Sequence, residues 1–273
     1  MVAQWRNWSA LYGLDGSDGL LKMPVYESKG NHDGGNSTDQ TMPHYIASEI
    51  IARNQLRKAE PSFELERISA TGLHYSWGWQ ASSSCRLHFV QLGLYAGHTC
   101  VGCAPAPSCF YGRNCYASFV YPEDSLGFLE EDLAALPPGT PVFTVQHYGF
   151  DGYSNDWYAQ VERDEYYATL SKYNVVALLV GHTHAASTYS WNGSSTGPLG
   201  TVPGGIPVFN TPSTQKEAGP CNPTPCSPAP SEYLVIEMDI AEGARSGTLR
   251  MAQRVGEGWG SAARALLNFT CPS

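Results

Sequence analysis

Several short apolar runs in this chain end directly at polar turns that carry glycine or histidine. Residues 141–146 (PVFTVQ) run into His147, and residues 174–180 (NVVALLV) run into the turn GHTH at 181–184. Residues 23–28 (MPVYES) lead in the same way into a turn of sequence GNHD. β-Branched and aromatic residues fill these runs over lengths typical of buried strands. The pattern predicts a sheet whose strand ends carry polar side chains.

The remaining elements alternate in type. Strand patterns also occupy residues 85–94, 206–210, 232–240 and 247–255. Leucines recur every three or four residues within the segment 123–139, as expected of a helix that ends at its Pro-Pro-Gly sequence. Two further helices are expected, over residues 43–58 and 156–172. Strands alternating with helices predict an α/β layered fold with at least one parallel or mixed sheet, and the last two strands are expected to be antiparallel because no helix separates them.

Two segments depart from this alternation without dividing the chain. Residues 95–118 hold four cysteines and two prolines, and we interpret them as a cysteine-rich insertion closed by disulfides, with a zinc site as the alternative. Residues 211–231 form a proline-rich loop in which Cys221 and Cys226 are expected to pair. Because strand patterns continue on both sides, we expect one domain over residues 1–273.

Composition limits the classes of partner. Apolar residues make up 42% of the chain and charged residues 15%, as in a folded globular protein. Sixteen basic residues against 25 acidic ones give a net charge of -9, and no basic run interrupts this balance. A nucleic-acid-binding or membrane-binding basic patch is therefore not expected. No apolar stretch approaches the roughly 20 residues that a transmembrane helix needs.

The cysteines and glycosylation motifs point to export. The chain has eight cysteines, and N-x-S/T sequences occur at Asn7, Asn36, Asn192 and Asn268. We therefore expect a secreted or lumenal glycoprotein with disulfide bonds. Residues 1–14 lack the charged and apolar regions of a signal peptide, so we expect the natural N-terminus to lie upstream of Met1.

The histidine-bearing strand ends suggest a metal site. Ligands of open α/β sheets bind outside the carboxyl ends of the strands, so the three turns can converge in one crevice. Imidazole is the commonest metal ligand, and an asparagine carbonyl also suits such cations. Taken singly, GNHD could be an ordinary turn and a lone histidine a satisfied polar side chain. The two histidines of GHTH can face one crevice if the segment is extended, or diverge towards two neighbouring ions if it is a tight turn. The ordered set of three turns favours a metal site.

The series GNHD, a strand ending in a lone histidine, and GHTH resembles the calcineurin-like metallophosphoesterase family. That family includes purple acid phosphatases, acid sphingomyelinase-like enzymes and protein phosphatases, and the resemblance covers residues 24 to about 210. It implies a β-sandwich flanked by helices. It also implies hydrolysis of phosphate esters, mono- or diesters, at two divalent or trivalent metal ions such as Fe, Zn or Mn. The substrates implied are phosphorylated small molecules, lipids or proteins.

The resemblance assigns the metal ligands residue by residue. Asn31 resembles the amide ligand of the second metal. His147 and His182 resemble the two imidazole ligands of that metal, and His184 resembles a ligand of the first. Two cations about 3.5–4 Å apart can polarise a phosphoryl group and lower the pKa of a water between them.

The same resemblance assigns the proton donor. His32 resembles the histidine that contacts the phosphate and protonates the leaving oxygen, and Asp33 resembles its orienting carboxylate. An imidazole held by a carboxylate is a suitable general acid near neutral pH.

Two motifs of the family pattern are absent from the residues before Gly30. The D-x-H strand and the G-D segment that supply the remaining metal ligands do not occur there, and we expect them upstream of Met1. The fold is therefore expected to be N-terminally incomplete. The alternative function is that of a truncated, non-catalytic family member that acts as a binding protein.

Overall fold

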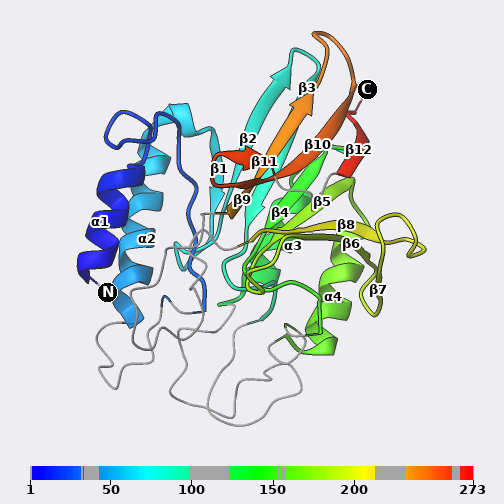
Figure 1. Ribbon diagram of the computed structural model, residues 1–273, viewed down its shortest axis with the longest axis horizontal. Coiled ribbons are helices and arrows are strands. Elements are labelled where there is room, and N and C mark those ends of the chain that lie inside the picture. The colour runs from blue at the N-terminus through cyan, green and yellow to red at the C-terminus, as the bar shows by residue number, and fades with distance from the viewer. Residues whose placement is uncertain are drawn as a thin grey trace.

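Two β-sheets pack against each other, and helices cover the other face of the larger sheet (Figure 1). This arrangement belongs to a computed structural model that describes residues 2–31, 33, 43–98, 123–152, 154, 158–212, 232–259 and 265–272. The α/β layered fold expected from the sequence is confirmed.

The larger sheet is mixed and has eight strands in the order β1-β2-β3-β4-β5-β8-β6-β7. Its strands are β1 (Leu65–Ile68), β2 (Tyr75–Ser82), β3 (Cys85–Gln91), β4 (Val142–Val145), β5 (Val175–Val180), β6 (Ser187–Trp191), β7 (Thr196–Gly197) and β8 (Ile206–Asn210). The central strands β3, β4, β5 and β8 run parallel, whereas both flanks are antiparallel. The four parallel strands therefore end at one common edge.

The smaller sheet comes from the end of the chain. It comprises β9 (Glu232–Asp239), β10 (Ser246–Val255), β11 (Gly258–Trp259) and β12 (Ala265–Thr270), with β10 pairing the other three. The expected antiparallel finish is confirmed by the pairing of β9 with β10.

The alternating side chains of β4 show how the layers are joined. Val142 and Thr144 face the helices, where the Thr144 hydroxyl lies 2.6 Å from that of Tyr166. Phe143 faces the smaller sheet and shares a buried cluster with Leu249 of β10. Each large apolar side chain buried in this way, such as Val142 or Phe143, contributes about 1.5–3 kcal/mol by leaving water.

The helices follow the predicted pattern with two exceptions. The described helices are α1 (Val2–Tyr12), α2 (Pro43–Ala59), the 3-10 turn η1 (Pro61–Phe63), α3 (Ser125–Ala134) and α4 (Gln160–Leu170). The leucine stripe of α3 is buried, as its spacing predicts. Helix α1 was not expected from the sequence, and α4 begins after residues 158 and 159, later than the predicted start.

The predicted strand over residues 23–28 is wrong, because side chains occupy the backbone groups that a neighbouring strand would pair. The Val25 carbonyl accepts a hydrogen bond from the Arg57 guanidinium at 2.7 Å, and the Glu27 carbonyl accepts one from the Tyr75 hydroxyl at 2.8 Å. The Val25 amide donates to the carbonyl of Leu14 at 2.9 Å. The segment is extended but belongs to neither sheet.

A disulfide between Cys85 and Cys271 joins the start of β3 to the residue after β12, across the two sheets. Most of the cysteine-rich insertion and of the proline-rich loop, including Cys221 and Cys226, lies outside the described residues. Among the helices that the structure describes, none has the length and apolar character to cross a membrane.

Candidate metal-binding site

The parallel strands bring two of the predicted turns together. His147 follows the end of β4, and its backbone amide donates to the carbonyl of Gly93, just beyond β3, at 2.9 Å. Gly181 follows β5 and donates its amide to the His147 carbonyl at 2.9 Å. The turn GHTH is therefore tied by its backbone to the turn that carries His147. This adjacency follows from parallel pairing, which places the carboxyl ends of neighbouring strands side by side.

The turn GNHD, which carries Asn31, is held near the same edge by a buried cluster of ion pairs. Glu27 is 8% exposed, and its carboxylate accepts from Arg53 at 2.7 Å and also from Arg57. Both arginines belong to α2, and Arg57 is fully buried. A buried carboxylate held by two guanidinium groups fixes the backbone around it, because breaking one such pair leaves an uncompensated buried charge. The cluster thereby holds the extended segment that leads to Asn31.

Asn31 and His147 are in direct contact at this edge. The Asn31 carbonyl oxygen lies 2.8 Å from Nε2 of His147, so the imidazole donates from Nε2 in this arrangement. The ring lies against the backbone of Gly30, where an added Cβ would come within 3.1 Å of its Cε1 atom. A side chain at this position would therefore require the His147 ring to move by a few tenths of an ångström.

His182 stands beside His147, with ring centroids 5.2 Å apart. The buried ring of Tyr148 meets His182 edge to face, with centroids 4.5 Å apart. Nδ1 of His182 lies 3.3 Å from the Ser154 hydroxyl, which in turn donates to a carboxylate oxygen of Asp151 at 3.2 Å. This chain of contacts fixes the orientation of the His182 ring through its Nδ1 atom.

Ser154 and Asp151 did not stand out in the sequence. Their only local signal is the spacing of three residues, since the Asp151 carboxylate also accepts the Ser154 amide at 3.0 Å in an ordinary polar turn. Their contact with His182 depends on the tertiary structure.

The other predicted site residues are His184, Asp33 and His32. His184 is exposed, and among the described residues no hydrogen bond or ring contact joins it to Asn31, His147 or His182. The Asp33 carboxylate accepts the amide of Gly30 at 2.5 Å and so closes the turn that contains Asn31. His32 lies outside the described residues, so the predicted pairing of Asp33 with it stays a prediction.

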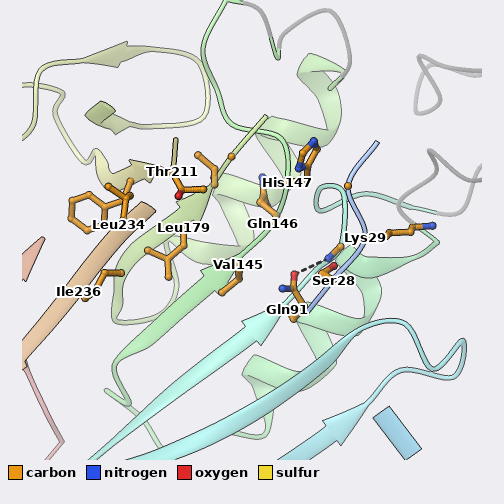
Figure 2. Close-up of a pocket in the computed structure, with 15 residues that line it drawn as sticks. Ser28, Lys29, Gln91, Val145, Gln146, His147, Leu179, Thr211, Leu234 and Ile236 are labelled. Carbon is orange, nitrogen blue, oxygen red and sulfur yellow. Dashed lines mark hydrogen bonds between the residues drawn. The ribbon is translucent and has the colours of Figure 1, made fainter. Parts of the chain in front are cut away.

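A cavity of about 360 Å³ opens beside His147. Its apolar wall includes Leu179 of β5 and Leu234 and Ile236 of β9, which Figure 2 shows grouped on one side. Ser28 and Lys29 lie on the other side, and the buried Lys29 pairs with Glu123 at 2.9 Å. The cavity therefore has a polar end at the turns and an apolar end between the two sheets.

The donor set fits one cation and does not fit two. Ligands bound to one ion at about 2.0–2.2 Å lie roughly 3 Å apart, close to the 2.8 Å between Asn31 and His147. His182 can complete a set of three neutral donors. Within the described part of the chain, however, no group of three or more His, Cys, Asp or Glu side chains is placed to hold a metal. A second ion would have only His184 among these residues.

Asp15 and Asp18, the aspartates that precede Asn31 in the sequence, do not supply ligands for a second cation. Asp15 and Asp18 accept backbone amides of their own turn, from Ser17 and Leu14 respectively, each at 2.7 Å. They are turn carboxylates that follow helix α1.

No protein-family model matches the chain, and no curated protein matches it. Among solved structures, a dimetal phosphatase from Danio rerio is similar over 92% of this chain and 74% of its own, with 13% sequence identity and a TM-score of 0.47. A similarity of this size carries no functional assignment.

Proposed function

We propose that this chain is a metal-dependent phosphoesterase whose cation is held by Asn31, His147 and His182. The observation that supports the proposal is the meeting of three turns, distant in sequence, at the carboxyl edge of the parallel strands. Their donor atoms are an amide oxygen and two imidazoles, which together suit Zn, Mn or Fe.

A cation bound here would supply Lewis-acid polarisation of a phosphoryl oxygen and a lowered pKa for a water beside it. The chain's own residues supply the remaining parts. The 2.8 Å contact places the Asn31 oxygen and Nε2 of His147 side by side, and Ser154 with Asp151 orients His182. With a cation bound, Nε2 of His147 would carry no proton, so the hydrogen bond to Asn31 would be replaced by the two metal bonds. His32 is proposed to donate a proton to the leaving alcohol oxygen, held in place by Asp33.

A second cation, with His184 as one ligand, belongs to the same proposal. Its other ligands would have to come from residues beyond those that the structure describes. Substrates are proposed to be phosphate esters of small molecules, lipids or proteins, and the protein is proposed to act in a secretory or extracellular compartment.

A second candidate function is a binding protein without catalytic activity. The observation in its favour is the absence of a carboxylate ligand beside the two central imidazoles within the described residues. Such a protein would keep the cavity and the cation but lack turnover.

Hydrolysis of model esters distinguishes the two. The full chain, loaded with Zn²⁺ or Mn²⁺, is assayed against p-nitrophenyl phosphate and bis(p-nitrophenyl) phosphate. The phosphoesterase proposal expects turnover that His147→Ala reduces at least a hundredfold and that His98→Ala leaves intact. His98 is a suitable control because it is an exposed histidine outside the cavity lining. Cation binding without turnover would favour the binding protein.

A further inference from the structure

The turn that carries His182 and His184 has an unusual backbone. His182 has a φ of 76° and His184 a φ of 58°, so both lie in the left-handed region. This region is uncommon for residues with a Cβ atom, although histidine enters it more often than most, and two such residues in one turn indicate that surrounding contacts hold the backbone. The neighbouring structure must therefore supply contacts that keep the turn in this shape.

Asn210 lies between the two ends of that turn. It is the last residue of β8, and it pairs in parallel with Val180, the last residue of β5, and antiparallel with Ser187, the first residue of β6. Figure 1 shows β8 beside both strands. Its side chain is 2% exposed, so contacts made by its amide are shielded from water.

The side-chain nitrogen of Asn210 binds the turn at two points. It donates to the Thr183 hydroxyl, which lies between the two histidines, and to the carbonyl oxygen of Ala185 at 2.8 Å. These two bonds use both protons of the amide and bracket His184. The Asn210 side-chain oxygen is buried and has no hydrogen-bond partner within the described residues. The NH₂ group is therefore the part of the side chain that acts on the turn.

We propose that Asn210 is a positioning residue that holds the GHTH turn in its left-handed shape and so keeps His182 directed beside His147. The part of this inference that concerns cations rests on the proposed function, whereas the part that concerns the backbone does not. Outer partners that orient metal ligands typically change metal affinity by 10- to 100-fold when they are removed.

Asn174 provides a matched control at the opposite end of β5. Its side-chain nitrogen also donates two hydrogen bonds, to the carbonyl oxygens of Gly139 at 2.8 Å and Thr270 at 2.9 Å. Asn174→Asp also removes a side-chain NH₂ group that donates two hydrogen bonds. Asn174 precedes the first residue of β5, whereas the histidine turn follows the last one.

The test compares Asn210→Asp with Asn174→Asp in the full chain. Calorimetric titration with Zn²⁺ is expected to show a 10- to 100-fold weaker affinity for Asn210→Asp and an unchanged affinity for Asn174→Asp. The visible spectrum of bound Co²⁺, which reports ligand geometry, is expected to change only in Asn210→Asp. Thr183→Val is expected to weaken affinity partially, and Thr183→Ser, which keeps the hydroxyl, to restore it.

Two outcomes would overturn the proposal. The first is a lower melting temperature for Asn210→Asp with unchanged Zn²⁺ affinity and Co²⁺ spectrum, which would make Asn210 a purely structural residue. The second is equal amide hydrogen exchange in the two variants, and it applies if the parent chain binds no cation and the proposed function fails. Amide hydrogen exchange across residues 182–185 is then expected to be faster in Asn210→Asp than in Asn174→Asp, and equal exchange would refute the positioning role.

Discussion

Asn31 and His147 are separated by 116 positions in the sequence, yet the Asn31 carbonyl oxygen lies 2.8 Å from Nε2 of His147. Neither residue lies within a helix or strand. The contact depends on the end of β4 on one side and on the segment held by Glu27 on the other. It joins the first and second of the three turns.

Glycine before Asn31 is predicted to be essential for this contact. In Gly30→Ala the new Cβ would lie 3.1 Å from the His147 ring, so we expect the ring to move by a few tenths of an ångström and the contact with Asn31 to be disturbed. We expect Zn²⁺ affinity to fall about tenfold, by the same reasoning as for outer partners of metal ligands. Gly258→Ala is the control, because a Cβ there approaches no atom closer than 3.7 Å. Equal affinities in the two variants would contradict the close approach at Gly30.

His32→Ala is predicted to abolish ester hydrolysis while the chain still binds its cation. The expected loss in kcat is about 10²–10⁴-fold, the usual contribution of a positioned general acid. Metal content and turnover are measured on the same sample. If metal and activity disappear together, His32 is a ligand and its assignment as the proton donor is wrong.

His88 is predicted to make the stability of the fold depend on pH. Its ring is buried between Asp132 and Glu66, 2.6 Å and 2.7 Å away. Burial lowers the pKa of His88, but the hydrogen bonds that the ring donates to Asp132 and then to Glu66 outweigh it and raise the pKa from 6.5 to about 9. Because the folded pKa is raised, the stabilisation is complete below about pH 6.5 and is lost as the pH rises through 9.

Chemical denaturation at several pH values tests this dependence. His88→Gln is expected to have a lower free energy of unfolding than the parent at pH 6, by on the order of 3 kcal/mol. The difference is expected to shrink towards pH 9 and above. A difference that stays constant over this range would mean that His88 is not charged in the folded protein.

The Cys85–Cys271 disulfide is predicted to stabilise the packing of the two sheets without affecting the site. Cys85 begins β3, at the end of the strand opposite to the histidine turns. The double variant Cys85→Ala, Cys271→Ala is expected to lose about 2–5 kcal/mol of unfolding free energy. Its Zn²⁺ affinity below the melting temperature is expected to be unchanged, and a weakened affinity would show that the site depends on this bond.

The sequence predicted the elements whose signal is local. The strands β4 and β5 and the leucine stripe of α3 are periodic in their own residues, and the turns that follow the two strands could be recognised without a partner. The extended segment before Asn31 has the same apolar character as a strand. Its backbone groups bind Arg57 and Tyr75, which no local pattern reveals.

The supporting residues of the site could not be predicted for the same reason. Asn210 ends an ordinary strand, and Ser154 with Asp151 forms an ordinary turn. The contact of Ser154 with His182 arises only when β4 and β5 lie side by side, and the contacts of Asn210 arise only when β8 lies between β5 and β6. Polar side chains that act through one tertiary hydrogen bond leave no periodic signal in the sequence.

The central claim is that Asn31, His147 and His182 hold one cation, and calorimetric titration of the metal-free full chain with Zn²⁺ tests it most directly. The claim predicts saturable binding that His147→Ala weakens by at least a hundredfold and that Lys172→Ala, a change at an exposed residue outside the cavity lining, leaves unchanged. Binding that is equally strong in His147→Ala, or no binding by the parent chain, would contradict it.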